Sequence, residues 1–211
     1  MKITKLGHCC LIIEEQGIRI LTDPGAWTTE QNEARDIDVV LITHEHPDHL
    51  HNDSVRTVLQ NNPSAKIYTN KAVGKILEKE QIPFDLVEHG QSRDERGVSI
   101  EGHGELHAPI YPGIPQVQNT GFFIADRFFY PGDALFNPGK PVEILALPVA
   151  GPWLKMSEVI DYAKAIHPKV VFPVHDGMLK ILGPFHMLPE MMLTKIGINV
   201  LALESGKEMQ F

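Results

Sequence analysis

The sequence contains few cysteines. Of its 211 residues only Cys9 and Cys10 are cysteine, and the two are neighbours. Neighbouring side chains on a strand point to opposite faces, so a disulfide bond between these two would be strained. A framework of disulfide bonds is therefore excluded, and we expect two reduced, buried thiols.

Long apolar runs are also missing. No segment approaches the roughly 20 consecutive apolar residues that a membrane-spanning helix needs. The sequence shows no secretory signal peptide, because Asp23-Pro24-Gly25 interrupts the apolar pattern before a cleavage site. We therefore expect a cytoplasmic protein without a membrane partner.

Clusters of positively charged residues are missing as well. The 19 lysine and arginine residues are outnumbered by 27 aspartate and glutamate residues, which gives a formal net charge of −8. Proteins that bind long nucleic acids carry clusters of lysine and arginine, and none is found here. The expected partner is a small-molecule substrate, which bound metal would attract if it is anionic.

The remaining composition is that of an ordinary globular protein. Hydrophobic residues make up 43% and charged residues 22% of the sequence. A chain of this length can bury the core of one domain, so we expect a single domain over residues 1–211. Strand-like and helix-like segments alternate throughout, which predicts a layered α/β fold.

Hydrophobic periodicity and turn residues predict the following elements. Strands are expected at 3–6, 9–13, 18–21, 37–42, 66–69, 85–88, 98–106, 121–124, 128–130, 142–149, 169–172 and 198–201. Helices are expected at 52–60, 71–80, 158–166 and 188–196. Asn52 or Asp53 would cap the first helix, and Ser157 the third.

Four side chains of metal-ligand type follow the apolar strand 37–42 directly: His44, His46, Asp48 and His49. His44 and His46 are two residues apart on an extended segment, so both imidazoles project to one side. Pro47 ends the strand, and the turn beyond it can direct two further ligands back. This spacing predicts a compact metal site.

This run resembles the metal-binding motif of the metallo-β-lactamase superfamily, and the resemblance extends over nearly the whole chain. Members also have a mid-chain histidine after a strand, an aspartate in a Gly-Asp pair that bridges two metals, and a late histidine after another strand. Gly132-Asp133 fits the pair, and His175 fits the late position. The resemblance implies a four-layer αββα sandwich with two mixed sheets.

The mid-chain histidine is either His103 or His107. His103 lies between two glycines within the segment that begins at Val98. His107 stands at the end of that segment, before a proline-rich loop. We favour His107, because functional residues gather at the ends of strands.

The resemblance implies two divalent ions. The first would be held by His44, His46 and His107, the second by Asp48, His49 and His175, with Asp133 bridging. Zinc is the expected metal, and manganese, nickel and iron are alternatives, because histidine and aspartate sites accept several metals. Gly7-His8-Cys9-Cys10 and Asp23-Pro24 resemble the branch that contains ascorbate-6-phosphate lactonase and N-acyl-phosphatidylethanolamine phospholipase D.

The implied activity is that of a binuclear metal-dependent hydrolase. A metal-bridging hydroxide would attack a small ester, lactone or phosphodiester. Asp48 and Asp133 would place the ions and orient the nucleophile, and His8 is a candidate acid or substrate contact. Asp23 either accepts a hydrogen bond from a ligand histidine or simply forms a turn before proline.

Four further side chains are expected to contact the substrate: Tyr111, Trp153, Lys155 and Phe185. Tyr111 lies in the proline-rich loop after His107, and proline restricts the flexibility of such a loop. Lys155 either binds a phosphate or carboxylate or is a solvated lysine before a helix.

Two other functions compete with the hydrolase. The first is a mono-iron oxidoreductase resembling the sulfur dioxygenases of the superfamily, and the second is a non-catalytic metal-binding scaffold. The ligand set argues against a scaffold, which has no need of seven metal ligands. Edge strands or Met191-Met192-Leu193 could form an interface in a homo-oligomer.

Overall fold

The computed structural model describes residues 1–211. In the N-terminal part the elements are β1 (Lys2–Gly7), β2 (Cys10–Glu15), β3 (Ile18–Thr22), η1 (Glu30–Glu33), β4 (Val39–Leu41), α1 (Asn52–Asn61), β5 (Lys66–Thr69), α2 (Lys71–Lys79) and β6 (Asp85–Leu86). They are followed by β7 (Ser92–Glu95), β8 (Val98–His103), β9 (Gly121–Ile124), β10 (Phe128–Tyr130), β11 (Ile144–Pro148), α3 (Met156–Ile166), β12 (Val170–Val174), α4 (Gly183–Leu193), η2 (Thr194–Ile196), β13 (Asn199–Val200) and β14 (Glu208–Gln210).

The strands form two seven-stranded sheets. The first has the order β14-β1-β2-β3-β4-β5-β6, and the second β13-β12-β11-β10-β9-β8-β7. Both are mixed: β2 and β3 are antiparallel while β3 and β4 are parallel, and β9 and β10 are antiparallel while β10 and β11 are parallel. The predicted architecture of two mixed sheets is confirmed.

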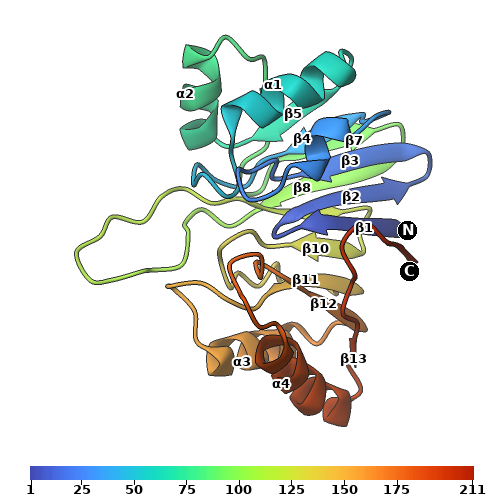
Figure 1. The fold of residues 1–211 in the computed structure, drawn as a ribbon, viewed down its shortest axis with the longest axis vertical. Helices are drawn as coiled ribbons and strands as arrows, with labels where there is room; N and C mark the ends of the chain where they lie inside the picture. The colour runs from blue at the N-terminus through green and yellow to red at the C-terminus, as the bar shows by residue number, and fades with distance from the viewer.

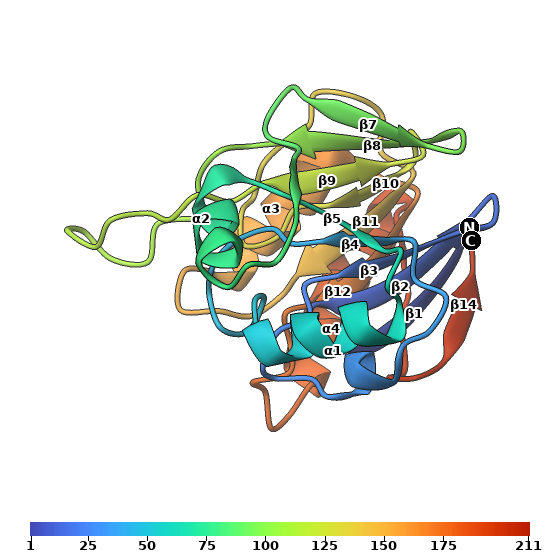
Figure 2. The same ribbon diagram turned by 90° about the horizontal axis from the view of Figure 1, so that it is seen from above.

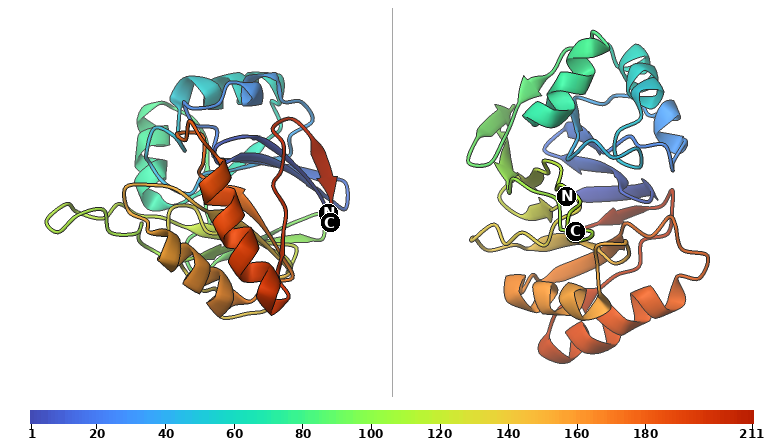
Figure 3. Two further views of the ribbon diagram at one scale, coloured as in Figure 1. Left: turned by 60° about the horizontal axis from the view of Figure 1, so that its bottom comes forward. Right: turned by 90° about the vertical axis from the view of Figure 1, so that its left-hand side faces the viewer.

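Helices cover the outer face of each sheet, so the fold has four layers. Helices α1 and α2 lie over the first sheet and α3 and α4 over the second (Figure 1; Figure 3, right). A core of 22 buried residues fills the space between the sheets, and clusters of 15 and 12 lie under the two helical layers. Strands with apolar side chains on both faces, such as β11, are buried throughout, as central strands of such a sandwich must be.

The two cysteines lie on opposite faces of the first sheet, and both are free and buried, as expected. Cys9 belongs to the core between the sheets, whereas Cys10 belongs to the cluster under α1 and α2. None of the helices combines the length and the apolar character needed to cross a membrane.

Several predicted boundaries are wrong. The strand from Val98 ends at His103 rather than at residue 106. Helix α1 is capped by His51, and α3 starts at Met156 after Lys155, so that Ser157 lies inside it. Helix α4 begins at Gly183, well before residue 188. The polar strands β7 and β14 were not predicted, because neither shows the apolar alternation of a half-buried strand.

The ends of the strands bring distant parts of the chain together. Strands β3, β4 and β5 run parallel, as do β10, β11 and β12, so each set ends at one edge of its sheet. The long loop between β8 and β9 extends from the molecule at the same side (Figure 2). In open α/β sheets this edge is where ligands bind.

Candidate metal centre

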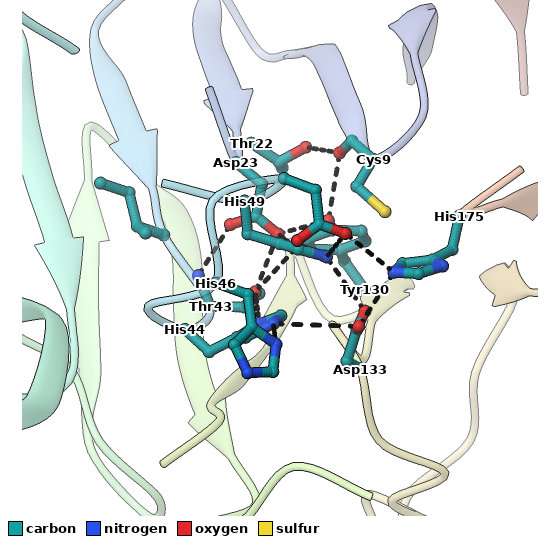
Figure 4. Close-up of polar contacts among 12 residues, drawn as sticks. Cys9, Thr22, Asp23, Thr43, His44, His46, His49, Tyr130, Asp133 and His175 are labelled. Carbon is teal, nitrogen blue, oxygen red and sulfur yellow. Dashed lines mark hydrogen bonds and ion pairs between the residues drawn. The ribbon is translucent and has the colours of Figure 1, made fainter. Parts of the chain in front are cut away.

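The predicted ligands follow four different strands. His44 lies just beyond β4, His107 beyond β8, Asp133 beyond β10 and His175 directly after β12. These four side chains and His49 are buried, whereas His46 and Asp48 are partly exposed. Figure 4 shows His44, His49 and His175 pointing towards one another around Asp133.

Two groups of potential ligand atoms lie at the centre. The first donor group comprises His44, His46, His107 and Asp133, and its ligand atoms all lie within 4.8 Å of one another. The second donor group comprises His8, Cys9, His49 and His175, with ligand atoms equally close together. Each group has the size of a site for one metal ion.

Asp133 faces both donor groups. Its Oδ2 atom lies 3.4 Å from His107 Nε2 and 2.9 Å from His175 Nε2, and its Oδ1 atom lies 3.1 Å from His49 Nε2. Asp48 approaches only the second group, with Oδ2 3.4 Å from His175 Nε2. Asp133 thus approaches histidines of both donor groups, whereas Asp48 approaches those of the second.

His107 and His175 present their Nε2 atoms to the centre because carbonyl oxygen atoms hold their Nδ1 atoms. His107 Nδ1 lies 2.5 Å from the carbonyl oxygen of Ala108, and His175 Nδ1 lies 2.6 Å from that of Ala150. Carbonyl oxygens only accept hydrogen bonds, so the Nδ1 atoms carry the protons. Once Nε2 has lost its proton, its electron pair faces the centre, as a metal-ligating histidine requires.

The donor atoms fit metal ions. His49 Nε2, His107 Nε2, His175 Nε2 and Asp133 Oδ1 are buried without a hydrogen-bond partner. Buried polar atoms are rarely left unsatisfied, and a cluster of them that consists only of metal-ligand types is able to bind a cation.

Asp23 orients His49 from behind. Its Oδ2 atom lies 2.7 Å from His49 Nδ1 and accepts hydrogen bonds from the hydroxyl groups of Thr43, at 2.8 Å, and Tyr130, at 2.5 Å. The Thr43 amide donates to Oδ1 at 2.7 Å. The expected contact between Asp23 and a ligand histidine is confirmed. Thr43 Oγ1 also lies 3.0 Å from His44 Nδ1, so the same network fixes a second ring.

Asp133 is positioned by Asn119, which the sequence analysis did not single out, and by Trp153, which was expected to contact the substrate. Its amide donates to Asn119 Oδ1 at 3.0 Å, and the Trp153 indole donates to its Oδ2 atom at 3.1 Å. Gly132 has a φ of 65°, and a Cβ atom there would lie 2.5 Å from Asn119 Oδ1. These partners come from distant segments and leave no local pattern in the sequence.

Without an ion, protons balance the charge of the centre. Burial and the neighbouring His49 hold the pKa of His44 well below its ordinary value. Burial alone would lower the pKa of His175, but Cys9 and Asp133 raise it to about 10. Burial would raise the pKa of Asp133, yet His49 and His175 hold it well below the usual range. Metal binding must therefore displace protons from this cluster.

His8 is buried and contacts a predicted ligand. Its Nε2 atom lies 3.1 Å from Asp48 Oδ2, and its Nδ1 atom accepts a hydrogen bond from the Gly177 amide at 3.1 Å. Because Nδ1 accepts, the ring proton is on Nε2 and is donated to Asp48. His8 therefore holds the Asp48 carboxylate in place.

His103 lies outside both donor groups, whereas His107 belongs to the first. The ring of His103 is 3.1 Å from Glu101 Oε2 and packs among phenylalanine side chains. The structure thus brings the alternative favoured from the sequence to the centre.

The four predicted substrate contacts occupy different surroundings. Trp153 lines a hollow beside His107, in addition to bonding Asp133. Tyr111 is 69% exposed on the loop between β8 and β9. Lys155 is exposed at the start of α3, and Phe185 packs on the core cluster under α3 and α4. Of the four, only Trp153 lines this hollow.

Comparisons with known proteins identify the family. Residues 2–175 match the family model of the β-lactamase superfamily domain. The protein Rv0786c of Mycobacterium tuberculosis is 35% identical over 184 residues, which cover 85% of each chain. A UPF0173 metal-dependent hydrolase of Methanocaldococcus jannaschii is 25% identical over 190 residues, 85% of this chain and 86% of that one.

A solved structure shares the fold. The metallo hydrolase Igni18 of Ignicoccus hospitalis superposes with a TM-score of 0.76 at 20% identity, covering 100% of this chain and 98% of that one. The resemblance to the ascorbate-6-phosphate lactonase branch stays a prediction. The match to the family model, which spans most of the sequence, shows that the chain belongs to the β-lactamase superfamily.

Proposed function

We propose that this metal-dependent hydrolase holds two divalent ions and cleaves a small ester, lactone or phosphodiester. One observation carries the proposal: two groups of potential ligand atoms lie side by side, and the Asp133 carboxylate approaches His107 of the first group and His49 and His175 of the second. Bound at these positions, zinc or a similar ion supplies hydroxide near neutral pH and a positive charge for the oxyanion of the reaction.

The side chains of the site have distinct roles in this proposal. Asp133 would hold both ions, and Trp153 and Asn119 hold Asp133 in place. Asp48 binds the second ion, and His8 keeps its carboxylate directed towards the centre. Since the His8 proton is already committed to Asp48, we assign His8 to positioning rather than to proton transfer.

A hollow beside the first donor group suits a small substrate. Its volume is about 440 Å³, and six of its ten lining residues are hydrophobic. Ligand sites combine such apolar walls with a few polar groups that fix the orientation. Trp153 and Phe136 would contact the apolar part of the substrate, while its polar or anionic reacting group faces the ions.

Metal stoichiometry tests the proposal. Purified, tag-free protein should contain about two equivalents of zinc or manganese by elemental mass spectrometry. Asp133→Ala should lose metal because it removes the ligand shared by both ions. Asp161→Ala, at a side chain that is 77% exposed on α3, should keep the wild-type content.

Phosphodiesters, lactones and carboxylic esters are the test substrates. Metal-loaded wild type and Asp161→Ala should turn over the substrate at similar rates, and Asp133→Ala should be slower. Absence of metal, even after incubation with zinc, would refute the proposal and favour a scaffold. A single iron ion would support the oxidoreductase instead.

A further inference from the structure

The tight turn between β1 and β2 projects a thiol into the metal centre. His8 and Cys9 form this turn, and Cys9 is only 2% exposed. Its Sγ atom and the nearest ring nitrogens of His49 and His175 all lie within 4.8 Å of one another. Figure 4 shows the sulfur atom directed towards the His175 ring.

The ring nitrogens beside this thiol need a partner. The Nε2 atoms of His49 and His175 are buried and make no hydrogen bond. Zinc–nitrogen and zinc–sulfur bonds of about 2.0 and 2.3 Å place the donors of a tetrahedral site roughly 3.3–3.8 Å apart. Donors within 4.8 Å of one another reach this separation through small side-chain movements.

His8 is a poor competitor for the same position. Its Nδ1 atom accepts the Gly177 amide proton, and its Nε2 atom faces Asp48 Oδ2. Both nitrogens are engaged, so His8 would have to break a hydrogen bond to bind an ion.

Hydrogen bonds hold the backbone of Cys9 in place. Its carbonyl oxygen accepts the hydroxyl of Thr22 at 2.9 Å and that of Tyr130 at 3.1 Å. The carbonyl oxygen of His8 accepts the His175 amide at 3.1 Å. The turn is thereby tied to the loop that carries His175, and a fixed backbone is what a ligand requires.

We propose that the Cys9 thiolate is a ligand of the second ion, together with Asp48, His49 and His175; this inference rests on the proposed binuclear function. The thiol proton is released to solvent when the ion binds. A thiolate is a softer ligand than a carboxylate or imidazole, so it favours zinc over manganese. The second position should therefore select zinc more strongly than the first, which has only histidine and aspartate ligands.

X-ray absorption at the zinc edge tests the proposal directly in the zinc-loaded protein. One of the two zinc ions should have a sulfur neighbour at about 2.3 Å. The spectrum averages over both ions, so it should show half a sulfur neighbour per zinc in addition to nitrogen and oxygen neighbours. Cobalt-loaded protein should likewise show a sulfur-to-cobalt charge-transfer absorption in the near ultraviolet.

The adjacent cysteine provides a matched control. Cys9→Ala should lose the sulfur neighbour and bind the second zinc at least tenfold more weakly, as judged by competition with a chelator. Cys10→Ala removes an equally buried thiol on the opposite face of the first sheet. This variant should keep the sulfur neighbour and the wild-type affinity for the second zinc.

The outcomes separate this inference from the proposed function. Wild-type protein with two zinc ions and only nitrogen and oxygen neighbours would overturn the role of Cys9 and leave the binuclear centre intact. Protein that binds no zinc would overturn both. The wild-type spectrum decides the question even if Cys9→Ala fails to fold.

Discussion

A single carboxylate, that of Asp23, sets the direction of the His49 ring. It is fully buried and accepts hydrogen bonds from Thr43, His49 and Tyr130, three of them at the Oδ2 atom. Such a carboxylate fixes the proton of the ring on Nδ1 and increases the basicity of Nε2.

Asp23→Asn should weaken zinc binding about 10- to 100-fold, because a neutral amide cannot accept all these hydrogen bonds. Tyr130→Phe removes one donor and leaves the contact between Asp23 and His49, so its effect should be smaller. Competition with a zinc chelator measures both affinities. Equal affinity of Asp23→Asn and wild type would show that Asp23 has no part in ligand orientation.

Local spacing could predict only part of this site, and His107, Asp133 and His175 were expected from the family resemblance. His44, His46, Asp48 and His49 lie on one segment and stand out as a group. By contrast, the hydrogen bond from Trp153 to Asp133 depends on how the loops after β10 and β11 meet. Cys9 was expected to be an inert buried thiol, because nothing in the sequence shows which strand end it faces.

At the level of elements, the turn after β3 supports the loop that carries the histidines. The Ala26 amide donates to the carbonyl oxygen of Pro47 at 2.7 Å, and the His51 amide donates to that of Pro24 at 3.1 Å. A Cβ atom on Gly25 would lie 1.8 Å from the carbonyl oxygen of Asp48. Only glycine allows the two backbones to approach this closely.

Gly25→Ala should therefore displace the loop and reduce metal content, with a loss of stability of about 1–3 kcal/mol, the usual cost of overpacking. Gly183→Ala is a suitable control, because its nearest neighbour would be Met187 Sδ at 4.0 Å. Elemental analysis and urea unfolding measure the two effects. Full metal content in Gly25→Ala would contradict the supporting role of this turn.

Some strands and helices could be predicted from the sequence with their observed bounds and others could not, for physical reasons. Strands β5, β9 and β10 were predicted with their observed bounds, because apolar runs between turn residues mark buried strands. Helix α4 was predicted to begin at residue 188, whereas it begins at Gly183 with Pro184 in its first turn. Proline is tolerated in the first turn of a helix, but Pro189 lies in the interior, where packing on the core overrides its low helix propensity.

At the scale of the whole molecule, a buried ion pair links the two sheets next to the metal centre. Lys5 of β1 donates to both carboxylate oxygens of Asp176, each at 2.7 Å, just after β12. Burial would raise the pKa of Asp176, but His186 and Lys5 lower it below its ordinary value. The folded state is therefore stabilised when this carboxyl group is ionised.

Asp176→Asn should lower the free energy of unfolding by about 3–5 kcal/mol near neutral pH, because it leaves Lys5 buried without a counter-charge. A carboxyl group with a lowered pKa contributes stability above its unfolded pKa of about 3.9 and loses that contribution as the pH falls through the folded pKa. Urea unfolding should show a constant difference between variant and wild type from pH 7 to pH 5, and a smaller one below about pH 4. A difference independent of pH would contradict this assignment.

The order of the elements along the chain has a further consequence. Strands β1 to β6 build the first sheet and β7 to β13 the second, so a cut near residue 91 separates the layers, apart from β14. His44, His46, Asp48 and His49 would then belong to one fragment, and His107, Asp133 and His175 to the other. An ion that binds only the assembled form favours assembly. Added zinc should therefore drive the two fragments to reassociate, so that zinc controls the assembly of the split protein.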